Sequence, residues 1–135
     1  MKQITLNWLR GAEYDIETAE SLLKARRYIY VIFMCHLAVG KTLKAVIAET
    51  STTPPPRTHN LYRLLELGRL NLPEAHEAIV AQLNTMNTAT RYPEDVAALS
   101  VEVTRKVAQT YLTRTKELLS WLRSDGRLQP SSSAT

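Results

Sequence analysis

The stretch Tyr28–Ala48, YIYVIFMCHLAVGKTLKAVIA, decides the fold of this 135-residue chain. It is apolar around nearly its whole circumference, which is typical of a helix that other elements cover on most sides. It nevertheless carries His36, Lys41 and Lys44, and charged groups inside a core need particular partners. We therefore expect a central helix whose charges are neutralised by its neighbours.

An amphipathic helix is predicted before this stretch, because apolar residues recur there at helical spacing and charged ones fall on the other side. Its apolar stripe consists of Ile4, Trp8, Ala12, Ile16, Ala19 and Leu23. After the central helix, three consecutive prolines at 54–56 remove backbone donors and predict a stiff, exposed loop. Thr58 then predicts the N-cap of a short third helix that Gly68 closes.

Two proline–acid pairs predict the starts of the remaining helices, since proline suits the first turn and an acid suits the positive end of the dipole. Pro73 opens a fourth helix to about Met86, and Pro93 opens a long last helix to about Arg123. The last helix has an apolar arc of somewhat over half its circumference. So broad an arc can cover a core and a second surface, so we expect a homodimer.

Five helices and no strand signal predict an all-α, five-helix up-and-down bundle. The length suits one domain, which we place at residues 1–126, followed by a disordered tail at 127–135. The lone Cys35 indicates a reducing, cytoplasmic location, and we expect no membrane-spanning segment. The net charge of +4 permits contact with nucleotide or RNA without requiring it.

Three charges interrupt the apolar faces of the predicted helices: Asp15, Lys44 and Arg114. Unpaired burial of a charge would cost several kcal/mol, so we expect Asp15 to find a cation. Lys44 on the neighbouring helix is the predicted partner, with Arg114 as the alternative. A competing interpretation is that both cations only bury their stems and keep their heads in water.

Four segments in order resemble the HEPN family of small five-helix domains. They are Trp8 with Ala12, Asp15 and Ala19, then Phe33–Ala45 (FMCHLAVGKTLKA), then Thr58-His59-Asn60-Leu61, and finally Thr90-Arg91-Tyr92-Pro93-Glu94-Asp95, which matches an R-Y-P-[DE] motif. Many relatives carry an acid where this chain has Gly40. A glycine within a helix is unfavourable, so Gly40 is interpreted as the mark of a close helix contact.

The resemblance implies a module that dimerises and partners a separately encoded minimal nucleotidyltransferase, as in two-component or toxin-antitoxin systems. One branch of the family cleaves RNA without metal, using an arginine followed a few residues later by a histidine. In that chemistry histidine moves a proton of the ribose 2′-hydroxyl and arginine holds the phosphate. A metal-independent ribonuclease toxin is therefore the alternative function.

Only Arg69 and His76 have the spacing of such a catalytic pair, and they lie in the turn between the third and fourth helices, away from the R-Y-P segment. We favour the binding module for this reason. The candidate ligand-binding residues are Arg91, Tyr92, His59 and Lys41. Arg91 precedes a helix N-terminus, which suits phosphate, although it could equally tie the loop to a carboxylate.

His59 could titrate near neutrality or could simply pack. The three histidines and one cysteine have no metal-site spacing, and the sequence predicts no cofactor.

Overall fold

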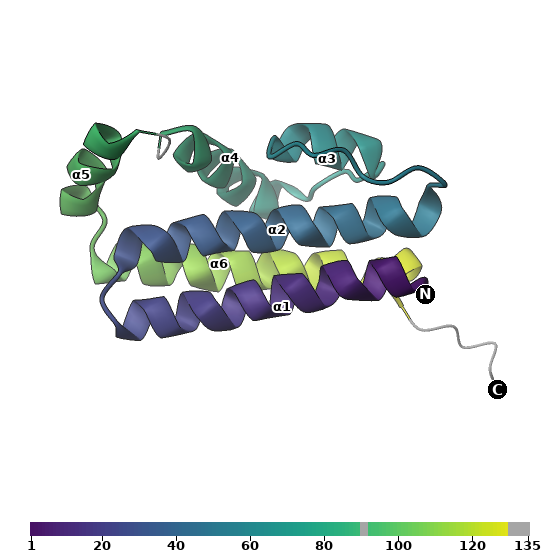
Figure 1. The fold of residues 1–135 in the computed structure, drawn as a ribbon, viewed down its shortest axis with the longest axis horizontal. Coiled ribbons are helices and arrows are strands. Elements are labelled where there is room, and N and C mark those ends of the chain that lie inside the picture. Colours follow the sequence, from purple (N-terminus) through teal and green to yellow (C-terminus); the bar gives the residue numbers. More distant parts are fainter. Residues whose placement is uncertain (90–91, 130–135) are drawn as a thin grey trace.

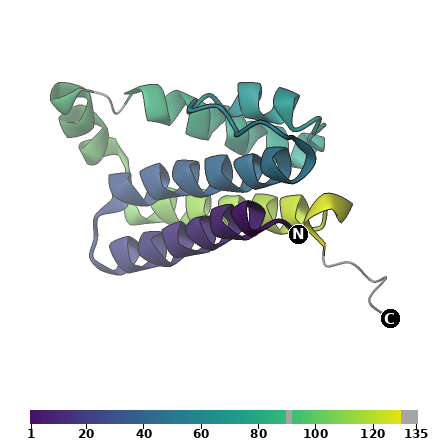
Figure 2. The same cartoon turned by 45° about the vertical axis from the view of Figure 1, so that its right-hand side comes forward.

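The computed structural model describes residues 1–89 and 92–129 of the chain, and these form helices and connecting loops without a strand. The elements in order are α1 (Gln3–Lys24), α2 (Tyr28–Thr50), α3 (Leu61–Leu67), α4 (Glu74–Ala89), α5 (Pro93–Glu102), α6 (Arg105–Arg123) and a 3-10 turn, η1 (Gly126–Leu128). Figure 1 shows α1, α2 and α6 lying side by side as three long rods, with α3 and α4 on the opposite side of α2. The turned view in Figure 2 keeps this arrangement.

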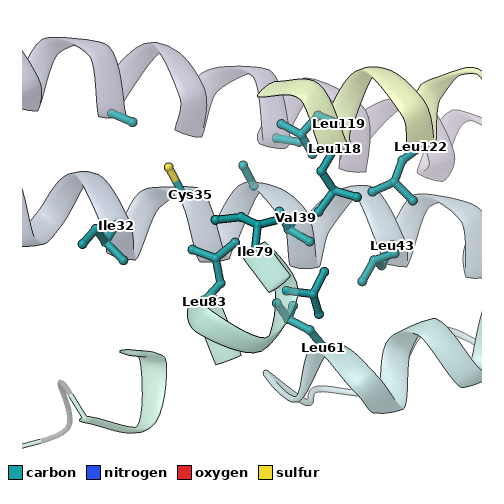
Figure 3. Close-up of a cluster of buried hydrophobic side chains, with 14 of the residues drawn as sticks. Ile32, Cys35, Val39, Leu43, Leu61, Ile79, Leu83, Leu118, Leu119 and Leu122 are labelled. Atoms are coloured by element: carbon teal, nitrogen blue, oxygen red, sulfur yellow. The ribbon is translucent and has the colours of Figure 1, made fainter. Parts of the chain in front are cut away.

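Helix α2 is the core of the domain, as its apolar sequence predicts. Val39 and Leu43 are fully buried, and side chains from three other helices converge on this part of α2 (Figure 3). These are Leu61 of α3, Ile79 and Leu83 of α4, and Leu118, Leu119 and Leu122 of α6. Burying such side chains contributes roughly 1.5–3 kcal/mol each, so α2 organises the fold.

Helix α2 is more apolar over its length than the sequence analysis allowed. Among the described residues, α2 is the one helix that is long and apolar enough to cross a membrane. However, 72% of its most apolar 18-residue stretch is buried inside the protein. A core helix passes the same test of length and composition. Its burial here is that of a core helix.

The predicted last helix is in fact two helices, so the described residues contain six α-helices instead of five. Val103 has an extended backbone (φ −82°, ψ 99°), and the hydroxyl of Thr104 accepts a hydrogen bond from the Val107 amide at 3.3 Å. Thr104 is thus the N-cap of α6. The break also interrupts the single apolar arc predicted for one long helix, and Val107, three residues after the break, is 37% exposed.

The short third helix is capped by Asn60 and not by the predicted Thr58. The Asn60 side chain accepts a hydrogen bond from the Tyr62 amide at 3.1 Å, while the Thr58 hydroxyl accepts one from the Asn60 amide. Both side chains therefore satisfy backbone donors at the entrance to α3, and the helix starts two residues later than the sequence suggested.

Order continues past the predicted domain end at residue 126. Leu128 of η1 is 4% exposed and packs with Leu9, and the Arg127 guanidinium donates to the Gly68 carbonyl at 2.6 Å. Arg127 also pairs with Asp125 at 2.8 Å, and these bonds hold the pKa of the Asp125 carboxyl below its usual value. The predicted tail was therefore started too early; residues 130–135 lie outside the described residues.

Candidate functional site

The charged residues of α2 lie along the seam between α1 and α2. Asp15 of α1 is 4% exposed, and the Lys41 ammonium of α2 stands 2.8 Å from its Oδ2 atom. That oxygen has no hydrogen-bond partner, so the ion pair with Lys41 is what offsets the cost of burying its charge. The expectation that Asp15 finds a cation is confirmed, whereas both predicted partners, Lys44 and Arg114, are wrong.

Gly11 explains why Lys41 reaches Asp15. A Cβ atom at Gly11 would lie 3.2 Å from the Cδ atom of Lys41, which means that the lysine stem crosses α1 at this glycine. Gly11 lies one helical turn before Asp15 on the same face. The missing side chain therefore opens the path along which Lys41 approaches the carboxylate.

Lys44 makes a different contact. Its ammonium lies 5.3 Å from the centre of the Trp8 ring, a cation–π geometry. Partial burial, and then repulsion from the Lys41 charge, lower the pKa of Lys44. The described residues give Lys44 no carboxylate partner, and Arg114 is exposed on α6.

His36 ties α2 to the loop before α3. Its Nε2 atom lies 3.0 Å from the His59 carbonyl oxygen, and the two rings are 6.3 Å apart. Because a carbonyl only accepts, Nε2 carries the proton, and Nδ1 is left buried without a partner. Burial lowers the pKa of His36 to about 4, so the ring is neutral at pH 7.

Gly40 does not mark a close helix contact, contrary to the sequence interpretation. A Cβ atom at Gly40 would meet only a methyl group of Leu61, at 3.9 Å, which is an ordinary van der Waals distance. The space beside Gly40 would admit a methyl group, so packing does not require glycine there.

A groove of about 550 Å³ lies where the ends of α1 and α2 meet the proline loop. Its lining includes the cations Lys2, Lys44 and Arg57, together with Trp8 and the three prolines, and no acidic residue. This groove was not predicted from the sequence, because Trp8 was assigned to the apolar stripe and the prolines were interpreted only as a stiff, exposed loop. The sequence holds one clue to the groove, since Arg57 directly follows the three prolines.

The family model for the HEPN domain matches residues 5–125. The chain belongs to the HEPN family. Two crystal structures are similar to it in fold: TT1696 from Thermus thermophilus, with TM-score 0.76, 20% identity, and coverage of 90% of this chain and 98% of that chain; and ST0689, an archaeal HEPN homologue, with TM-score 0.74, 23% identity, and coverage of 96% and 100%. No curated protein matched the chain.

The candidate catalytic residues of this HEPN domain make separate contacts. The His76 ring packs with the Trp121 ring of α6 at 5.9 Å between centroids. Arg69 is exposed just after α3 with a left-handed backbone, φ 53°. No hydrogen bond or ring contact joins the two in the described part of the chain, so the structure gives the predicted pair no shared site.

The candidate ligand residues of the HEPN domain are likewise spread over the molecule. Lys41 is engaged with Asp15, and His59 is exposed next to His36. Tyr92 is 61% exposed at the start of α5, which Figure 1 shows at the far end of the bundle from the N-terminus. Arg91 lies outside the described residues. Within residues 1–89 and 92–129, no three His, Cys, Asp or Glu side chains form a group that could hold a metal ion.

Proposed function

We propose that this HEPN domain is a binding and assembly module that dimerises and partners a separately encoded minimal nucleotidyltransferase, with nucleotide or RNA as candidate ligand. The observation that carries the proposal is apolar surface left uncovered on the central helix. Tyr30 and Phe33 of α2 are 51% and 38% exposed, although the rest of α2 is mostly buried. Exposed apolar patches beside polar surface are typical of interaction sites.

The neighbouring helix α5 covers this end of α2 only loosely. No residue of α5 is buried, and Val96 of α5 lines a shallow hollow with Ile29, Tyr30 and Phe33. Val101, also in α5, is 84% exposed. A second copy of the chain placed on this α2–α5 surface would remove these side chains from water, which supports the dimer in the proposal.

The ribonuclease alternative has less support. Its histidine has to be free to move a proton and its arginine has to face the same phosphate. His76 instead packs with Trp121, and among the described residues no hydrogen bond or ring contact joins it to Arg69. We therefore do not propose that the chain cleaves RNA.

The test is the mass of the purified protein and of its complex. Light scattering of the chain alone is expected to give twice its mass of 15.3 kDa. The proposal also requires a gene for a minimal nucleotidyltransferase beside the gene for this chain, and the two proteins are expected to co-purify when they are co-expressed. Phe33→Lys is expected to break the dimer, whereas Tyr14→Lys, at a 70% exposed aromatic residue of α1, serves as the matched control. A monomeric wild-type chain that also fails to co-purify with that enzyme would refute the proposal.

A further inference from the structure

We propose that the groove between Trp8, Lys44 and the proline loop binds a small organic phosphate of about mononucleotide size. The proposal deepens the binding function by naming a ligand class and a place for it. The groove shares no lining residue with the hollow on the α2–α5 surface.

The first observation is the charge of the groove. Lys2, Lys44 and Arg57 line it without any acidic lining residue, and the described residues give Lys44 and Arg57 no carboxylate partner. The nearby Glu49 carboxylate accepts hydrogen bonds from the Lys2 amide and the Thr5 hydroxyl and interacts with the Lys2 charge, so it offsets Lys2 but not Lys44 or Arg57. Unneutralised cations that line one groove favour an anion with more than one negative charge.

The second observation is the environment of Lys44. Its ammonium is half-buried over the Trp8 ring, and burial lowers its pKa, so its charge is poorly hydrated. A charge-assisted hydrogen bond from a partly desolvated ammonium to a phosphate is stronger than one made on an open surface. An anion at Lys44 would therefore recover part of the cost of keeping this charge in the protein.

The third observation is a set of unused donors. The Lys2 ammonium donates to the Ala48 and Ser51 carbonyls, both at 3.0 Å, and an ammonium has three donors, so one is left. Arg57 can hold a phosphate through two parallel hydrogen bonds.

The fourth observation concerns the body of the ligand. The remaining lining is largely apolar and stiff, with Ile4 and Ala48 on the helices and three consecutive prolines on the loop. Prolines keep an extended backbone and lose little entropy when a ligand packs on them. A volume of about 550 Å³ is within the usual range for small-molecule sites, so the groove has room for a ring next to the phosphates.

The test uses Trp8 as the reporter. Trp121 is the other of the two tryptophans, so Trp121→Phe leaves Trp8 as the only indole. In this background ADP is expected to change Trp8 fluorescence saturably, inorganic phosphate to act more weakly, and adenosine to have no effect. Calorimetry on the unmodified chain with ADP checks that the reporter variant has not altered binding.

Three variants localise the site. Lys44→Gln and Arg57→Ala are each expected to weaken ADP binding about tenfold, the effect of losing one charge-assisted hydrogen bond. Arg105→Ala removes the same charge from an exposed position on α6 and is expected to change binding by less than about twofold. Arg57 lies on an exposed loop, so its variant is expected to fold even where Lys44→Gln does not.

The absence of a saturable signal with ADP would overturn the proposal, and so would equal losses in Arg57→Ala and Arg105→Ala, which would indicate general charge attraction. A short RNA with a 5′-hydroxyl that binds more tightly than ADP and depends on Lys44 would also overturn it, because the ligand would then be a strand. All these measurements use the isolated chain, so their failure is distinct from failure to dimerise or to bind the nucleotidyltransferase.

Discussion

At the scale of single residues, the Asp15–Lys41 ion pair is the most consequential contact of the α1–α2 seam. The Asp15 side chain is 5% exposed and that of Lys41 is 32% exposed, at a separation of 2.8 Å. Lys41→Met is expected to lower the free energy of unfolding by about 2 kcal/mol, less than for a fully buried pair because Lys41 reaches water. Urea denaturation at pH 7 measures this change.

A double variant tests whether the stability lost in Lys41→Met comes from leaving the buried Asp15 carboxylate without a cation. Asp15→Asn with Lys41→Met removes both charges and is expected to recover a large part of the stability lost in Lys41→Met alone. Lys44→Met is the control for the loss of a lysine from the same helix. If it destabilises the protein as much as Lys41→Met and shows the same coupling to Asp15→Asn, the structural assignment of the pair is wrong.

The two glycines within the long helices are expected to respond differently to the same substitution. Gly40→Ala is expected to raise the free energy of unfolding by roughly 0.5–1 kcal/mol, because alanine favours the helix and the nearest atom, on Leu61, is 3.9 Å from the new Cβ. Gly11→Ala meets the Lys41 stem at 3.2 Å, so the same helical gain is opposed by displacement of Lys41. Thermal unfolding of both variants compares them directly, and a larger gain at Gly11 than at Gly40 would contradict the geometry.

At the scale of elements, one hydroxyl group caps the start of α6 at the break between α5 and α6. Thr104 accepts a hydrogen bond from the Val107 amide and so satisfies a donor at the start of α6. Thr104→Ala is expected to lower the free energy of unfolding by about 1 kcal/mol, whereas Thr104→Ser keeps the cap and most of the stability. Chemical denaturation of the two variants checks this, and equal stabilities would show that the cap does not stabilise α6.

The same break shows where sequence patterns lose their power. Pro73 and Pro93 predict helix starts because proline fixes the backbone angle that the first helical turn needs. Both predicted starts lie within one residue of the observed ones. The break at Val103 and Thr104 has neither glycine nor proline, and an apolar pattern continues across it. Its position depends on tertiary packing, since Val103 is 7% exposed and belongs to the core cluster.

At the scale of the whole molecule, the apolar sequence of α2 was enough to predict a central core helix, and Asp15 within an apolar stripe was enough to predict an ion pair. The identity of the partner was not predictable. Lys41 and Lys44 are three residues apart and both lie toward α1, so the sequence pattern could not separate them. Lys41 reaches Asp15 because Gly11 leaves space for its stem, whereas Lys44 lies over the Trp8 ring. Both contacts depend on how α1 and α2 pack together, which the sequence pattern does not give.

Global stability is expected to depend on pH through His36. Its folded-state pKa, about 4, lies below the ordinary value of 6.5 because the ring is buried, so between these values the unfolded chain binds a proton that the folded chain does not. Stability contributed by neutral His36 is thus complete above about pH 6.5 and falls as the pH drops toward 4. At 1.36 kcal/mol per pKa unit the loss is at most about 3 kcal/mol.

The measurement is the free energy of unfolding from urea titrations at several pH values between 4 and 7, for the unmodified chain and for His36→Gln. The variant loses the hydrogen bond to the His59 carbonyl or weakens it, so it is expected to be less stable at pH 7. It also lacks the titrating ring, so its stability is expected to fall less on acidification, and the difference between the two curves isolates His36 from the carboxylates. His59→Gln replaces an exposed ring in the loop before α3 and serves as the control. It is expected to keep most of the pH dependence of the unmodified chain. Parallel curves for the unmodified chain and His36→Gln would show that protonation of His36 does not govern the acid stability of this domain.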